Sequence, residues 1–243
     1  MPMGGYGGLL LRSDIKLRAG DCFGRMREAV CRLQPCLWEI VDFEGRMGYL
    51  VGYGFQRRRA ATHVLDLKEQ ESRSRQKTKR GAVQSAKRGV EIKEIEDEDH
   101  LKACYCLLQQ RDRAYGQNTK YPYEFFRNIW KELAAKGYAR IALAISQERI
   151  IGFSIDLFHD DTAVYWDGAS HPEFRSLRPA DALIQAAITW ALKRGGRWLN
   201  LGGSPPEAQG LVRFKENWGG RMREYDVYRR QSVWFNLLRR LKP

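Results

Sequence analysis

Residues 199–220 read LNLGGSPPEAQGLVRFKENWGG, an apolar run that ends abruptly in Gly202 and Gly203 and is followed by a second apolar segment with helical spacing. The run predicts a buried strand that opens into a turn. Ser204, which two prolines follow, is typical of the start of a helix, with the serine near the N-cap. The apolar positions of that helix need a core to face, and Lys215 falls between them. The stretch therefore predicts a strand-loop-helix unit that places a lysine on the edge of a buried helix.

The chain from residue 90 onward predicts one mixed α/β domain. Its expected elements are a strand (90–95), two helices (97–115 and 123–136), three strands (139–146, 149–158 and 163–169), a helix (180–194), a strand (197–201), the Lys215 helix and a strand pair around 223–230. Two helices follow the first strand, an antiparallel meander comes next, and one long helix leads to the Gly-Gly strand. This order excludes a doubly wound nucleotide-binding domain, because strands and helices do not alternate strictly. The sequence also has no Gly-x-Gly-x-x-Gly loop and no Gly-Lys-Ser/Thr loop.

Three motifs in this domain carry a resemblance to a known family. They are the Gly-Gly strand end followed by Arg-Phe-Lys at 213–215, the Tyr-Trp-Asp-Gly-Ala-Ser element at 165–170, and the basic helix end with Gly-Val at 84–90. In this order they resemble the last domain of the Fem-type aminoacyltransferases, whose fold is built from GNAT acyltransferase-like domains. The order of elements also resembles a complete GNAT domain. The resemblance implies an α/β acyltransferase whose catalytic domain spans residues 90–231.

The part of the chain before residue 90 resembles an incomplete second domain. A turn and strand at 6–11, a helix at 21–33 and strands at 37–43 and 63–67 match the back half of a GNAT-like domain. Residues 1–67 are therefore expected to form a partial N-terminal subdomain, with strand edges open to association. Residues 68–89 are expected to form a basic helical connector, which either binds phosphates or is simply solvated.

Composition limits the classes of partner. The chain has 243 residues and a formal net charge of +13, which favours polyanions such as nucleic acid, phosphorylated carriers or an anionic membrane surface. No apolar run reaches the roughly 18–20 residues that span a bilayer, so we expect a cytoplasmic protein. Five cysteines without Cys-x-x-Cys spacing and four scattered histidines indicate neither a disulfide framework nor a metal site.

The turn before the long helix bears on the donor substrate. In coenzyme A-dependent GNAT enzymes, the equivalent turn has small residues that let backbone amides at a helix N-terminus approach the pyrophosphate. Arg175 and Ala180 match the ends of that pattern, but Arg178 replaces its central glycine, and Pro179 has no amide hydrogen. The departure favours a donor other than acetyl-CoA. Arg175 and Arg178 could still bind phosphates through their side chains.

The resemblance implies an aminoacyl-tRNA donor and, as acceptor, a peptidoglycan precursor that bears a pyrophosphate. Amide formation needs a cationic or donor group where the oxyanion develops, and losing one such donor costs about 3–4 kcal/mol. Lys215 is the candidate for that role, and Asp167 is a candidate to accept the amine proton. The substrate-binding candidates are Phe214, Arg213, Tyr165, Arg175, Arg178, Gly202 and Gly203. No tightly bound cofactor is expected, only an aminoacyl-tRNA or acyl-CoA co-substrate.

Two other functions remain open at this point. One is an acyl-CoA-dependent N-acyltransferase of the same fold that modifies an exopolysaccharide or lipid. The other is a non-enzymatic remnant that binds RNA or a membrane. Residues 232–243 mix aromatic and apolar positions with Arg239, Arg240 and Lys242, which suits a short helix resting on the anionic face of the inner membrane. Docking of this tail onto its own domain is the alternative.

Overall fold

The computed structural model describes residues 19–32, 37–43, 45–69, 78–204 and 208–232. The chain forms two compact units. Residues 1–62 and 223–243 make the first, and residues 63–222 make the second. The prediction of a partial subdomain (1–67), a connector (68–89), a catalytic domain (90–231) and a tail (232–243) stays a prediction, since the compact units divide at other positions. Residues 6–11, most of the tail and most of the connector before Thr78 lie outside the described residues.

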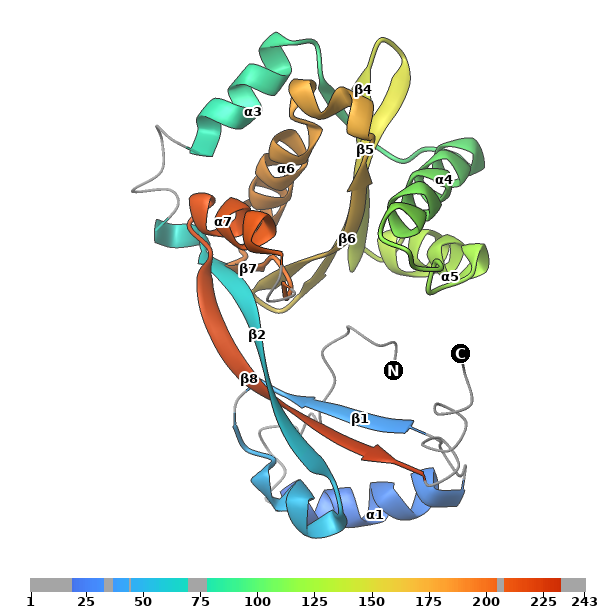
Figure 1. The fold of residues 1–243 in the computed structure, drawn as a ribbon, viewed down its shortest axis with the longest axis vertical. Helices are drawn as coiled ribbons and strands as arrows, with labels where there is room; N and C mark the ends of the chain where they lie inside the picture. The colour runs from blue at the N-terminus through green and yellow to red at the C-terminus, as the bar shows by residue number, and fades with distance from the viewer. Residues whose placement is uncertain (1–18, 33–36, 44, 70–77, 205–207, 233–243) are drawn as a thin grey trace. The chain divides into compact units, whose positions relative to one another are not determined.

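The second unit is built on a mixed sheet (Figure 1). Its strands are β3 (Glu91–Glu94), β4 (Ala139–Ser146), β5 (Arg149–His159), β6 (Thr162–Ser170), β7 (Trp198–Asn200) and the end of β2 (Gln56–Asp66). Their order is β2-β7-β6-β5-β4-β3. β3, β4, β5 and β6 pair antiparallel in succession, so the predicted meander is confirmed. β6 and β7 pair parallel, as expected for strands that a crossover helix connects.

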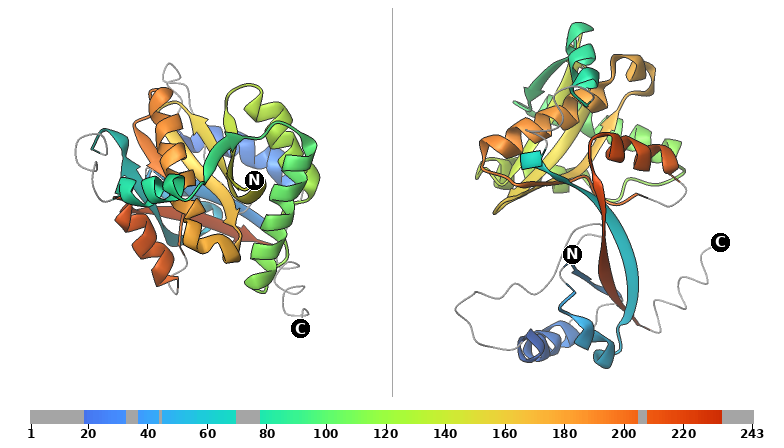
Figure 2. Two further views of the ribbon diagram at one scale, coloured as in Figure 1. Left: turned by 90° about the horizontal axis from the view of Figure 1, so that it is seen from above. Right: turned by 90° about the vertical axis from the view of Figure 1, so that its left-hand side faces the viewer.

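Helices cover both faces of this sheet (Figures 1 and 2). On one face lie α4 (Glu98–Ala114), α5 (Tyr123–Asn128) and the π-helix η2 (Ile129–Ala134). On the other lie α3 (Thr78–Lys87), α6 (Pro179–Lys193) and α7 (Gln209–Asn217). Asp97 begins α4 as its N-cap, where its carboxylate accepts the His100 amide at 2.8 Å. The helix predicted over 123–136 widens into the π-helix at Ile129, a local change that the periodicity does not reveal.

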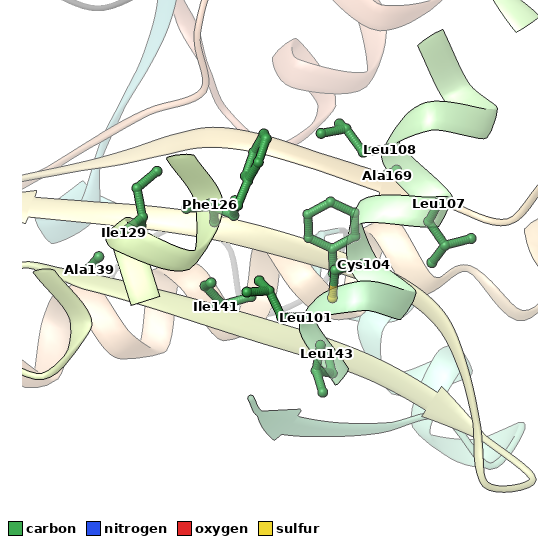
Figure 3. Packing of buried hydrophobic residues seen from close by; sticks show 12 residues of the cluster. Leu101, Cys104, Leu107, Leu108, Phe126, Ile129, Ala139, Ile141, Leu143 and Ala169 are labelled. Atoms are coloured by element: carbon green, nitrogen blue, oxygen red, sulfur yellow. The ribbon is translucent and has the colours of Figure 1, made fainter. Parts of the chain in front are cut away.

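Alternating residues of β4 face opposite sides of the sheet in the second unit. Ala139, Ile141 and Leu143 face α4 and α5, where Leu101, Cys104, Leu108 and Phe126 pack against them (Figure 3). Arg140 and the neighbouring alanines of β4 point to the opposite face. Two apolar clusters lie on that face. The β4 alanines join the first, whose buried members are Val90, Ala142, Ala144, Ile151, Ala182 and Leu183. The buried members of the second are Leu65, Leu67, Ala163, Ile184, Ala187, Ile188, Ala191, Leu199, Leu201 and Trp218. The period-two pattern thus gives the sheet a separate core on each side.

The first unit has its own small core. Its elements are α1 (Ala19–Arg32), β1 (Leu37–Asp42), the 3₁₀ helix η1 (Gly48–Tyr53), the first part of β2 and most of β8 (Arg221–Gln231). β1 pairs antiparallel with β8. Ile40, Met47, Leu50, Phe55 and Tyr228 form the buried cluster. The predicted strand pair around 223–230 is wrong, because no Gly, Pro or Asn interrupts this stretch and it forms one strand.

Candidate functional site

Lys215 is buried more deeply than its sequence position predicts. Its residue exposure is 6 %, and its Nζ donates to the carbonyl oxygens of Gly202 at 2.9 Å and Gly203 at 2.7 Å. The buried face of α7 carries Lys215 and Trp218, whereas Leu211, expected to face the core, is 42 % exposed. Among the described residues, which leave out 205–207, no carboxylate pairs with Nζ. Burial lowers the pKa of Lys215 to about 8, so the ammonium is still the major form at neutral pH.

The helix that carries Lys215 begins later than predicted. Ala208 is the N-cap and α7 starts at Gln209, so Ser204 is not the cap. A residue that precedes proline is disfavoured in the helical region, and this applies to both Ser204 and Pro205. The hydroxyl oxygen of Ser204 is buried and has no hydrogen-bond partner within the described ranges.

The turn that holds Lys215 is fixed by backbone hydrogen bonds. Gly202 has φ of +76°, a conformation that favours glycine, and its amide donates to Asn200 Oδ1 at 2.8 Å. The Gly202 carbonyl also accepts the His63 amide at 3.2 Å. Gly202 and Gly203, predicted as substrate-binding positions, therefore bind Lys215 through their carbonyls. The strand end, the turn and β2 together hold the ammonium in place.

His63 is a residue near Lys215 that sequence reasoning missed. It is 3 % exposed, and neither ring nitrogen has a hydrogen-bond partner within the described residues. Burial and then the charge of Lys215 lower the pKa of His63, which keeps the ring neutral at pH 7. The sequence does indicate that His63 is buried, because His63 and Leu65 share one face of β2 and buried Leu67 follows the strand with the same spacing.

β6 and β7 separate close to this turn. They pair only where Thr162, Ala163 and Val164 meet Trp198, Leu199 and Asn200. Beyond that point β6 continues along β5, and the register shifts between Tyr165 and Asp167 so that Trp166 is the extra residue of a bulge. Bulges of this kind commonly re-aim side chains next to active sites. Tyr165 is half-buried there, and burial, followed by the charges of Asp156 and Asp167, raises the pKa of its phenol.

Asp167 lies in an ion pair rather than free at a turn. Arg111 Nη1 donates to Asp167 Oδ1 at 2.5 Å and to the Gly168 carbonyl at 2.7 Å, and Arg111 also pairs with Asp112 at 2.7 Å. The Gly168 amide donates to the same Asp167 oxygen at 2.8 Å. These bonds fix the Asp167 carboxylate beside the bulge of β6. Arg111 was missed because nothing in its helix distinguishes it from a surface arginine.

A second ion pair, which is fully buried, lies on the α6 face of the sheet. Arg140 Nη2 donates to Asp156 Oδ2 at 2.6 Å, and their side chains are 7 % and 0 % exposed. Ser154 also donates to Asp156 Oδ2, at 3.3 Å. Burial raises the pKa of Asp156 to about 6, although Arg140 opposes the shift. The Arg140 guanidinium lies 5.1 Å from the Trp190 ring centroid. The buried charge of Arg140 is thus compensated on several sides.

The remaining predicted site residues do not converge on Lys215. Arg213 is exposed on α7 and Phe214 is half-buried against the α6-face core. Arg175 is exposed in the 3₁₀ helix η3 (Pro172–Leu177). Arg178 caps α6 with φ of +58°, the conformation in which the predicted family pattern has glycine. Its side chain pairs with Asp181 at 3.0 Å and donates to Gln84 at 2.8 Å, so it is not free to bind a phosphate as expected.

The described part of the chain supports neither a metal site nor catalysis by a cysteine thiol. No group of three or more His, Cys, Asp or Glu side chains there could hold a metal ion. Cys31, Cys104 and Cys106 are free thiols, and burial raises the pKa of Cys104 to about 12. Within the same residues, no helix is both long and apolar enough to cross a bilayer.

Comparison with solved structures identifies the fold. FemX superposes with a TM-score of 0.67 at 15 % identity, over 85 % of this chain and 75 % of FemX. L-PGS from Bacillus licheniformis gives 0.63 at 14 % identity, over 90 % and 76 %. A tandem GNAT protein from the clavulanic acid biosynthesis pathway gives 0.60 at 12 % identity, over 91 % and 73 %. At such identities the likeness establishes the fold alone, and it confirms the predicted GNAT-like α/β class.

The family itself is established by sequence. No match was found among curated proteins. The family model described as an acetyltransferase (GNAT) domain matches residues 72–231, which span the whole Lys215 turn, the β6 bulge and α6. The chain therefore belongs to the GNAT acetyltransferase domain family and is an acyltransferase.

Proposed function

We propose that this acyltransferase forms an amide on a cell-envelope precursor and that Lys215 stabilises the oxyanion of the reaction. The observation that carries the proposal is the buried ammonium of Lys215, held by the carbonyls of Gly202 and Gly203. Two carbonyl oxygens orient the ammonium but do not neutralise its charge. A group fixed in this way can respond to negative charge that develops only in the transition state.

The reaction needs no nucleophile from the enzyme. The acceptor amine attacks the ester carbonyl of the donor, and a C–N bond forms while the carbonyl oxygen becomes negative. Collapse of this intermediate breaks the C–O bond to the donor, and the amine proton leaves with the departing hydroxyl group. Lys215 would lower the energy of the charged intermediate. Because Arg111 holds Asp167 in an ion pair, we assign the carboxylate to shaping the β6 bulge and leave the proton to the departing oxygen.

For the donor we propose an aminoacyl-tRNA. The net charge of +13 favours a polyanionic donor, and Arg178 with Pro179 replaces the small, amide-donating turn of coenzyme A enzymes. FemX, one of the structures with this fold, motivates a peptidoglycan precursor as acceptor. A lipid-linked precursor would bring the protein to the cytoplasmic face of the inner membrane, where the basic tail could rest.

The alternative is an acyl-CoA-dependent N-acyltransferase. It is favoured by the description of the matching family as an acetyltransferase and by the separation of β6 from β7 beyond Val164. Binding of deacylated tRNA and of coenzyme A to the same protein distinguishes the two donors. Submicromolar tRNA binding without measurable coenzyme A binding supports the aminoacyl-tRNA donor, and the reverse result refutes it.

The salt dependence of tRNA binding tests whether the basic segment contributes. If Lys77, Lys79 and Arg80 neutralise tRNA phosphates, changing all three to Gln should flatten the slope of log affinity against log salt by roughly two to three units. Changing the exposed lysines Lys93, Lys102 and Lys136, which lie outside this segment, is the matched control for charge. An equal effect of the two triple changes would exclude a specific role for the basic segment.

A further inference from the structure

The N-terminus of α6 is where this fold would ordinarily bind a phosphate. α6 connects the parallel strands β6 and β7, so its first turn follows the carboxyl end of β6. Ligands of open α/β sheets bind at such positions, and free amides at a helix N-terminus attract anions. Pro179 has no amide hydrogen, the Arg178 amide donates to the Arg175 carbonyl at 3.0 Å, and the Asp181 amide donates to the Arg178 carbonyl at 3.2 Å. Three of the four residues 178–181, whose amides a helix start ordinarily leaves free, thus offer no free donor.

This helix end also contains an anion of its own. The Asp181 side chain is 13 % exposed in the first turn of α6, where a negative charge is stabilised by the helix dipole. Arg178 Nε donates to Asp181 Oδ2 at 3.0 Å. Arg178 adopts φ of +58° to do so, a conformation that is costly for a residue with a side chain. Asp181 therefore supplies the negative charge that a bound phosphate would have here, and Arg178 supplies the positive charge of an arginine that would bind it.

Helix α3 lies against the same turn (Figures 1 and 2). A Cβ on Gly81 would lie 2.7 Å from Asp181 Oδ1 and 3.0 Å from Arg178 Nη2, so a side chain there would have to displace the Asp181 carboxylate. Gln84 Oε1 accepts a hydrogen bond from Arg178 Nη1 at 2.8 Å. Arg88 at the end of α3 donates to the Ser176 carbonyl. Three contacts thus fasten α3 across the residues that precede and begin α6.

We propose that Asp181 is the resident anion of the α6 N-terminus and that Arg178 and α3 hold it there, so that this position excludes the phosphates of a donor. Arg178 and Asp181 then act as specificity-determining residues. They select against coenzyme A and for a donor whose phosphates bind elsewhere, and in this respect the inference rests on the proposed function. A phosphate at this turn would meet the Asp181 carboxylate and find few free amide donors.

The test uses inorganic pyrophosphate and coenzyme A as probes in calorimetric titrations of the purified full chain. For the unchanged protein we expect dissociation constants of about 1 mM or weaker for both. Asp181→Ser removes the resident anion and frees Arg178, so pyrophosphate affinity should rise about tenfold or more. Coenzyme A should gain less, because α3 still covers the turn. Asp99→Ser is the matched control, since Asp99 also lies in the first turn of a helix and pairs with a base three residues away, Lys102.

Three results would overturn the inference. They are low-micromolar coenzyme A binding by the unchanged protein, an unchanged pyrophosphate affinity in Asp181→Ser, and an equal gain in Asp99→Ser. Arg178→Gly is the second variant, because glycine adopts φ of +58° without strain and keeps the helix start folded. It should leave pyrophosphate binding as weak as in the unchanged protein, because the Asp181 carboxylate stays in the first turn of α6 and the guanidinium that would bind pyrophosphate is lost. Aminoacyl transfer by the same proteins is measured in parallel. If transfer is active but the pyrophosphate titrations do not give the expected affinities, only this inference is refuted. If the titrations give the expected affinities but no transfer occurs, only the proposed function is refuted.

Discussion

Lys215 and Arg140 are both buried cations on the α6 side of the same sheet, yet the protein treats their charges differently. Arg140 is 7 % exposed and pairs with Asp156, which is fully buried. Lys215 is 6 % exposed and donates to two backbone carbonyls. The first charge is neutralised inside the protein, and the second is oriented without being neutralised by any described residue. A paired buried charge is costly to break, because its partner is left uncompensated, whereas an oriented, uncompensated charge is available to a reaction.

The largest effect should come from breaking the compensated pair. Asp156→Asn keeps the shape of the side chain but leaves the Arg140 guanidinium buried without its counter-ion. Breaking such a pair costs about 3–5 kcal/mol, which we expect as the loss in the free energy of unfolding, measured by urea denaturation. Asp160→Asn, on the exposed turn between β5 and β6, is the control and should change little. A loss below about 1 kcal/mol for Asp156→Asn would remove the contrast between the two cations.

Removing the Lys215 ammonium should lower turnover. Lys215→Ala should lower turnover on the true substrates by about a hundredfold, because it removes a donor that acts in the transition state. Lys215→Arg should recover only part of the activity, since the planar guanidinium cannot take the place of Nζ between two carbonyls. Single-turnover rates measure both. An alanine variant with more than half of the original rate would exclude Lys215 from the mechanism.

The pH dependence of activity sharpens the contrast. Burial lowers the pKa of Lys215 to about 8, so the ammonium loses its proton as the pH rises through that value. Turnover that depends on the cation should therefore be maximal below pH 8 and fall by up to about tenfold per pH unit above it. A pH–rate profile from pH 6 to 10 provides the measurement. Constant activity up to pH 10 would contradict a cationic role for Lys215.

His63 should give the smallest effect. Its folded pKa is lowered, so the unfolded chain binds the proton more readily, and stability is lost as the pH falls below about 6.5. His63→Leu preserves the apolar packing and removes this titration, so the variant should lose less stability between pH 7 and pH 5. Urea denaturation at both pH values compares the two proteins. His100→Leu, at a residue outside the core, is the control, and equal changes in both variants would contradict the assignment.

The elements were predictable where periodicity is strong, and the site was predictable only in part. The α6 and β4–β6 segments follow clear helical or alternating patterns, so their bounds agree with the prediction within one or two residues. Lys215 itself was found from its motif, but its burial was not, because a lysine on a short helix has no periodic signal for a core position. The Arg111–Asp167 pair joins residues 56 positions apart, a contact that sequence pattern does not encode.

The contrast between the two cations is tested most directly by Lys215→Met, measured for unfolding free energy and for turnover in the same preparation. Methionine fills similar volume without a charge. Because the folded pKa of about 8 lies below the unfolded value of 10.5, the buried ammonium destabilises the protein at every pH below 8, and stability rises with pH between the two values.

We therefore predict that Lys215→Met is more stable than the unchanged protein by about 1–3 kcal/mol at pH 7. This difference should vanish above pH 10.5, while turnover falls about a hundredfold. Glu207→Gln, the nearest carboxylate before α7 in the sequence, serves as the control. A methionine variant that is less stable at pH 7, or that keeps its turnover, would contradict the account: Lys215 would then be a structural residue like Arg140.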